Sequence, residues 1–201
     1  MKVTKITNLP VQDNEGRLYY TVRVDTDAGI HGLGEVGISN WGRAIANAVD
    51  HLGELVIGAD PWDTEKLWQE MFRSGYFPAD KVYCCAISAI DIALWDIKGK
   101  SVNLPTYKLL GGQVREKVVC YPHIKGTDKQ QIVEGSKRAV DEGWKFVRWG
   151  QPDPWGSFEP GGISIIEPDK SMRLAVELMG EVREAVGPDI QMCFDVHTQL
   201  E

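Results

Sequence analysis

The chain has 201 residues, of which 43% are hydrophobic and 25% are charged, and its formal net charge is −7 at pH 7. These values are those of an ordinary globular protein of one large or two small domains. The negative charge and the lack of a basic run argue against nucleic acid as a partner. The sequence has neither a stretch of 18 apolar residues nor an apolar signal segment at its start, so we expect a cytoplasmic protein without a membrane span.

Four cysteines, at positions 84, 85, 120 and 193, include no CxxC pair. Two of them are adjacent in the sequence. This spacing matches neither a zinc site nor a disulfide framework. We therefore expect buried, reduced side chains.

The first half of the chain predicts three strands followed by helices. Segments 2–12 and 18–26 are rich in Val, Ile, Thr and Tyr, and the turn residues between them predict a hairpin. A second turn leads to a third strand at about 30–38. Apolar residues then recur with helical spacing in three segments, 45–56, 64–73 and 82–98. This order predicts an α+β domain with a three-stranded antiparallel meander.

The third of these strands contains a GxGxxG sequence, Gly32 to Gly37. A dinucleotide-binding turn requires a parallel strand, the glycines and then a helix within one βαβ unit. Here hairpin strands precede the glycines, which lie inside the expected strand. The context therefore favours another role for them, and an NAD-dependent oxidoreductase is the weaker alternative.

From Glu116 the pattern changes to strands that alternate with helices. The expected strands are 118–121, 145–149 and 190–197, and the expected helices are 128–142 and 169–186. Apolar strands alternating with helices are typical of a parallel sheet covered by helices. In such sheets the chemistry gathers at the carboxyl ends of the strands.

Polar side chains occur at those ends. Asp195 and His197 are two residues apart and should point to the same face of their strand. A carboxylate beside an imidazole suits a metal ligand next to a proton donor, although ordinary turn residues would give the same pair. Arg148 lies near the end of the second strand and His123 follows the first.

The segment from Gly150 to Pro168 is a long loop with four prolines, four glycines, Trp155 and Phe158. Loops of this length without secondary structure are usually functional or disordered. Prolines and aromatic residues favour an ordered wall or lid over a pocket, and an exposed insertion is the alternative.

Two segments of the chain resemble a known family. Ala86–Lys100 reads AISAIDIALWDIKGK and Leu104–Gly112 reads LPTYKLLGG. Both resemble the mandelate racemase/muconate lactonizing branch of the enolase superfamily. The resemblance implies an α+β capping domain over residues 1–115. It also implies that residues 116–201 are the first three β/α units of a (β/α)8 TIM-type barrel.

The resemblance also implies an activity. Enolase-superfamily enzymes use Mg²⁺ and remove the proton α to a substrate carboxylate. Asp195 matches the first metal ligand of the family. His197 resembles the acid of the mannonate and galactonate dehydratases, which protonates the departing 3-hydroxyl of a sugar acid and so yields a 2-keto-3-deoxy acid. Elimination needs such an acid because hydroxide is a poor leaving group.

The chain departs from the family pattern at the base. Arg148 stands where many relatives carry lysine, and arginine is a poor base because it stays protonated. The mannonate dehydratases pair a similar arginine with a loop tyrosine, but the loop 150–168 has none. The base is therefore not identified, and Arg148 is expected to act in catalysis by binding the carboxylate or polarising a neighbour. His123, Trp149 and Trp155 are expected to bind substrate.

A TIM barrel takes about 250 residues and eight strands, and residues 116–201 supply three. We therefore expect a longer parent chain, with the other metal ligands beyond residue 201 and little activity in this part alone. A homo-oligomer is also expected. The alternatives within the superfamily are a racemase, epimerase or cycloisomerase, and a further alternative is a non-catalytic relative that binds a sugar acid.

Overall fold

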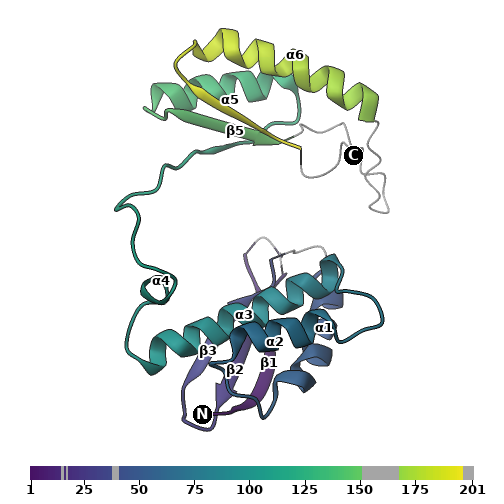
Figure 1. Ribbon diagram of the computed structural model, residues 1–201. Coiled ribbons are helices and arrows are strands. Elements are labelled where there is room, and N and C mark those ends of the chain that lie inside the picture. Colours follow the sequence, from purple (N-terminus) through teal and green to yellow (C-terminus); the bar gives the residue numbers. More distant parts are fainter. Residues whose placement is uncertain (15, 17, 38–40, 151–167, 197–201) are drawn as a thin grey trace. The chain divides into compact units, whose positions relative to one another are not determined.

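The computed structural model describes residues 1–14, 16, 18–37, 41–150 and 168–196 (Figure 1). The chain divides into two compact units, Met1–Val114 and Arg115–Glu201. Each unit has its own hydrophobic core. The two units are described separately below.

The sheet of the first unit is antiparallel, with β1 (Val3–Gln12), β2 (Leu18–Thr26) and β3 (His31–Glu35) in that order. The turn between β2 and β3 contains Gly29 at a φ of 76°, a backbone conformation that glycine adopts without steric cost. Alternation along β2 buries Val22 and Val24 completely. The predicted three-stranded meander is confirmed.

Four helices follow the sheet, α1 (Gly42–Val56), α2 (Thr64–Phe72), α3 (Lys81–Ser101) and the short α4 (Thr106–Leu109). The apolar stripe of α1 is fully buried through Ile45, Val49, Leu52 and Val56. Helix α3 begins after Asp80, whose carboxylate accepts bonds from the backbone N–H groups of Val82 and Tyr83. Helices α1 and α3 pack on the sheet (Figure 1).

The glycines of the GxGxxG sequence allow β3 to approach α3. A Cβ atom at Gly32 would overlap the carbonyl group of Ala93, and one at Gly34 would overlap that of Ala89. Both alanines are completely buried. The small residues on the two elements therefore form a close strand–helix contact, and this contact accounts for the two glycines.

The second unit alternates strands and helices as β4 (His123–Ile124), α5 (Lys129–Asp141), β5 (Phe146–Gly150), α6 (Pro168–Val186) and β6 (Gln191–Asp195). The three strands are parallel in the order β4-β5-β6. Both helices pack on one face of this sheet (Figure 1). The capping-type α+β unit followed by the first β/α units of a barrel was the predicted fold, and it is confirmed.

The strand predicted at Val118–Tyr121 is wrong, because the first parallel strand is His123–Ile124. His123 pairs with Arg148, and β5 begins only at Phe146. The same register would place residues 118–120 beside the turn that precedes β5, where no strand of the described chain offers a partner. Val118 and Val119 are accordingly 76% and 62% exposed.

The expectation of buried cysteines is also wrong. Cys84, Cys120 and Cys193 are exposed and Cys85 is half-buried. Cys193 alternates with Met192 and Phe194, which pack against the core, so its own side chain lies on the other face of the sheet.

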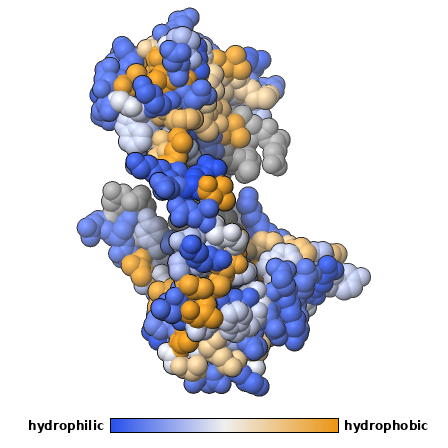
Figure 2. All heavy atoms as spheres, turned by 60° about the vertical axis from the view of Figure 1, so that its left-hand side comes forward, coloured by the Kyte–Doolittle hydropathy of each residue, from blue (hydrophilic) through white to orange (hydrophobic). Residues whose placement is uncertain are grey.

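Hydrophilic side chains cover much of the visible surface of both units, with apolar patches between them (Figure 2). Among the described residues, no helix combines the length and apolar character that a membrane crossing requires.

Candidate functional site

The carboxyl ends of the three parallel strands bring the predicted site residues into register. His123 on β4 lies level with Arg148 on β5, which lies level with Cys193 on β6. Two residues further along these strands, Gly150 of β5 lies level with Asp195 of β6. Residues two apart on a strand share a face, so these side chains lie on one side of the sheet.

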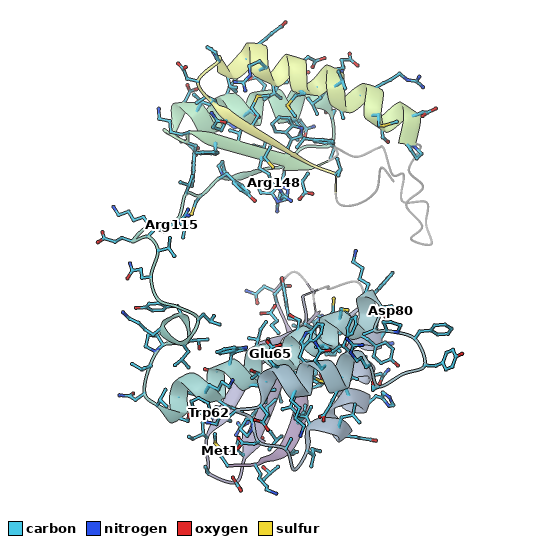
Figure 3. All side chains as sticks on the ribbon, in the orientation of Figure 1. Met1, Trp62, Glu65, Asp80, Arg115 and Arg148 are labelled. Atoms are coloured by element: carbon cyan, nitrogen blue, oxygen red, sulfur yellow. The ribbon has the colours of Figure 1, made fainter. Side chains whose placement is uncertain are left out.

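The opposite face of the sheet is apolar and packs against the helices. Val147 and Trp149, on either side of Arg148, are completely buried with Leu178 and Val182 of α6. This alternation forces Arg148 away from the helices, as Figure 3 shows. The apolar spacing of β5 therefore sets the direction of its arginine.

Arg148 bridges the other two polar groups. Its Nη1 lies 3.0 Å from both ring nitrogens of His123. Its Nη2 forms an ion pair with Oδ2 of Asp195. The side chains of Arg148 and Asp195 are 15% and 28% exposed, so this pair is partly shielded from water.

The charge on the guanidinium restricts what each partner does. Arginine only donates hydrogen bonds and stays protonated in proteins. The ring nitrogen of His123 that accepts a bond from Arg148 is therefore an unprotonated one. Arg148 itself cannot take a proton from a substrate, but a planar fork of N–H donors suits the binding of a carboxylate.

Asp195 supplies the kind of ligand that Mg²⁺ prefers, a carboxylate oxygen at the end of a strand. A carboxylate has two oxygens, so an arginine and a metal ion can share it. In the part of the chain that the structure describes, no group of three or more His, Cys, Asp or Glu side chains could hold a metal ion. By the chemistry of its carboxylate oxygens, Asp195 fits as one ligand of a metal centre, and the described residues do not complete that centre.

The structure brings together three of the residues singled out in the sequence, His123, Arg148 and Asp195. It does not place Trp149 with them. Trp149 packs in the core on the helix side of the sheet, because it is one residue from Arg148 on an alternating strand. His197 and Trp155 lie outside the described residues.

Cys193 shares the face of these polar groups and was not singled out in the sequence. It lies level with Arg148 and two residues before Asp195. The alternation that related Asp195 to His197 also extends backwards to Cys193, and that signal would have found it. Because the cysteines were expected to be buried apolar residues, Cys193 was not considered as a site residue.

The fold and the site define a class of protein, in which an α+β unit precedes parallel β/α units with polar groups at the strand ends. The model of the mandelate racemase / muconate lactonizing enzyme N-terminal domain matches residues 5–111, more than half of the chain. The chain therefore belongs to this family of the enolase superfamily.

Curated relatives extend the similarity through the second unit. A D-galactonate dehydratase from Pectobacterium atrosepticum is 32% identical over 201 residues, which cover 100% of this chain and 50% of the relative. The D-galactonate dehydratase family member RspA from Cellvibrio japonicus is 33% identical and covers 92% of this chain. The chain spans about half the length of these curated relatives.

A solved structure agrees with this similarity. The crystal structure of a putative dehydratase from Zymomonas mobilis ZM4 superposes with a TM-score of 0.78 at 36% identity. It covers 98% of this chain, which corresponds to 55% of that one.

Proposed function

We propose that the protein is a Mg²⁺-dependent dehydratase of a sugar acid, which converts an aldonate into a 2-keto-3-deoxy acid. The observation that carries the proposal is the 32% identity, over the whole of this chain, with a relative named D-galactonate dehydratase. The grouping of His123, Arg148 and Asp195 at the strand ends supports it, since this is where parallel β/α folds place their chemistry.

The reaction is a β-elimination. A base removes the proton from C2, the C3–O bond breaks, and the departing hydroxide leaves as water once it is protonated. The enol that remains tautomerises to the 2-keto acid. Mg²⁺ held by Asp195 would act as a Lewis acid and stabilise the negative charge that develops on the substrate carboxylate.

The described residues have separate roles in this proposal. Arg148 donates hydrogen bonds to the anionic substrate and, because it cannot lose its proton, is not the base. His123, which contacts Arg148, binds a substrate hydroxyl. His197 gives its proton to the departing 3-hydroxyl, and Trp155 binds substrate. The base is a residue other than these.

The experiment is a dehydration screen of the complete gene product against a panel of aldonates with Mg²⁺, with 2-keto-3-deoxy acid as the readout. Asp195→Asn should lose Mg²⁺-dependent turnover by removing a metal ligand. His197→Asn should stop elimination but leave C2 proton exchange with solvent. Lys137→Ala, on the exposed surface of α5, is the matched control and should keep full activity.

Other outcomes would replace the proposal. Inversion at C2 without loss of water would indicate a racemase or epimerase. Saturable binding of an aldonate without exchange or turnover would indicate a non-catalytic sugar-acid-binding relative.

A further inference from the structure

The position of His123 is set from the core side of the sheet in the second unit. Strand β4 has two residues, and both pair with β5, His123 with Arg148 and Ile124 with Trp149. Ile124 is buried in the core close to α5, where a Cβ atom at Gly135 would lie 2.6 Å from its Cγ2 atom. Because neighbouring residues of a strand point to opposite faces, this packing directs His123 to the polar face of the sheet.

The guanidinium of Arg148 joins His123 to the carboxylate of Asp195. Nη1 lies 3.0 Å from both ring nitrogens of His123, and Nη2 forms the ion pair with Oδ2 of Asp195. Three adjacent strands, β4, β5 and β6, therefore contribute one group each to a single chain of contacts. A guanidinium is planar and its N–H donors have fixed directions, so a bond at Nη1 limits how Nη2 can turn.

The bond to His123 supplies a second point of attachment for Arg148. The stem of an arginine side chain is flexible, so one bond at one nitrogen leaves its head group several orientations. With Nη1 held by His123, the ion pair fixes the carboxylate of Asp195 as well as the guanidinium. Metal affinity depends on such fixing, because loss of a group that orients a metal ligand typically weakens binding about 10–100-fold.

We propose that His123 is a positioning residue for the metal ligand. By holding Nη1 of Arg148, it sets the orientation in which the carboxylate of Asp195 meets Mg²⁺. The inference rests on the proposed function, because it takes Asp195 as a Mg²⁺ ligand. It goes beyond contact with a substrate hydroxyl, since it gives His123 an effect on the protein without substrate.

His123 is the informative position for a test, because its replacement keeps both charges of the ion pair. Removal of Arg148 would combine two opposite effects on Mg²⁺ binding. Loss of orientation weakens the binding, whereas loss of a positive charge beside the carboxylate strengthens it. His123→Leu removes the hydrogen-bond acceptor alone. His123→Asn keeps an acceptor, because the side-chain oxygen of asparagine lies close to the place of Nδ1 in the imidazole.

Calorimetric titration of the metal-free complete gene product with MgCl2, with no sugar acid present, measures the dissociation constant of Mg²⁺. His123→Leu should raise this constant about tenfold, and His123→Asn should stay within about threefold of the wild-type value. Asp195→Asn, which removes the ligand itself, should bind Mg²⁺ most weakly. The melting temperature of both His123 variants should be unchanged, because the imidazole is exposed.

The outcomes separate this inference from the proposed function. If His123→Leu kept the Mg²⁺ dissociation constant and raised only KM for the aldonate, His123 would contact substrate alone, and the inference would be overturned while the proposed function stood. Equal weakening in His123→Leu and His123→Asn would also overturn it, since the acceptor would then have no part in the effect. A wild-type protein that binds no Mg²⁺ would overturn both.

Discussion

Asp96 and Lys100 form an ion pair of 2.6 Å one turn apart on α3, and both side chains also bind the backbone of β3. Oδ2 of Asp96 accepts a bond from the N–H of Leu33 at 2.9 Å, and Nζ of Lys100 donates to the carbonyl of His31 at 2.8 Å. These backbone groups face away from β2, where another strand would pair. A helix side-chain pair thus takes the place of a fourth strand and protects this edge.

Asp96→Ala should lower the free energy of unfolding by about 1–2 kcal/mol, because it removes the acceptor of the Leu33 N–H as well as the ion pair. Lys100→Ala should cost less, about 0.5–1 kcal/mol. Lys66→Ala is the matched control, since Lys66 pairs with Glu70 one turn away at 3.8 Å, and it should change stability by less than about 0.5 kcal/mol. Urea unfolding gives the free energy of unfolding of all three variants. If Asp96→Ala and Lys66→Ala lowered it by the same amount, the role assigned to the bond between Asp96 and β3 would be contradicted.

Gly32→Ala and Gly34→Ala should each destabilise the first unit by about 1–3 kcal/mol, because the new methyl group overlaps a helix carbonyl. Gly37→Ala should be nearly neutral, since no atom of the described residues lies within 4 Å of the place that its methyl group would take. Thermal unfolding followed by circular dichroism gives the comparison. A near-neutral Gly34→Ala would show that β3 and α3 are less tightly packed than the structure shows.

Lys98 carries a positive charge into the core of the first unit, where it is only 7% exposed. Its Nζ donates to the hydroxyl of Thr64 at 2.8 Å and lies 4.4 Å from the ring centroid of Trp95. Burial lowers the pKa of Lys98 below its usual value of 10.5, and the negative charge of Asp91 opposes this shift. The folded state therefore releases this proton at a lower pH than the unfolded state does.

The stability of the wild-type protein relative to Lys98→Met should rise with pH towards 10.5. Between the lowered pKa and 10.5 the unfolded chain binds more protons at Lys98 than the folded one, so raising the pH favours folding. At about pH 7 the cost of burying the charge opposes the gain from the bond to Thr64, so the two proteins should differ by less than about 1 kcal/mol. Urea titrations at about pH 7 and about pH 10 test this, with Lys137→Met as an exposed control. If the difference in free energy of unfolding between the wild-type protein and Lys98→Met did not change with pH, the lowered pKa of Lys98 would be contradicted.

Arg148→Lys should lower kcat/KM of the proposed dehydratase by about 100-fold with little change in melting temperature. Lysine keeps the charge but lacks the fork of donors that reaches His123 and Asp195 together, so the substrate and its binding groups lose their alignment. Arg138→Lys on the exposed side of α5 is the control. The prediction fails if Arg148→Lys keeps wild-type kcat/KM on the aldonate identified in the screen.

The periodicity of apolar residues was enough to predict most of the fold. The stripe of α1 and the alternation of β2 each identify the buried face directly, because burial follows the repeat of the backbone. The strand predicted at Val118–Tyr121 failed for the opposite reason. Apolar and β-branched composition predicts a tendency to form a strand, but a strand also needs a partner in register, and local sequence does not contain that partner.

The site could be predicted only in part. Asp195, Arg148 and His123 were identified because strand ends concentrate chemistry in parallel sheets. Trp149 was assigned to the substrate from its type and its proximity in sequence, although alternation from Arg148 already directed it to the helices. The ion pair between Arg148 and Asp195 spans 47 residues and depends on the order of strands in the sheet, which the sequence pattern did not specify.

The bonds from Asp96 and Lys100 also bear on how the first unit moves. The N–H of Leu33 donates to Asp96 of α3, while the neighbouring residues of β3 pair with β2. The strand therefore separates from the sheet only if its bonds to the end of α3 also break. Amide hydrogen exchange in β3 should then follow that in the last turns of α3, so that the strand and the helix open as one cooperative unit.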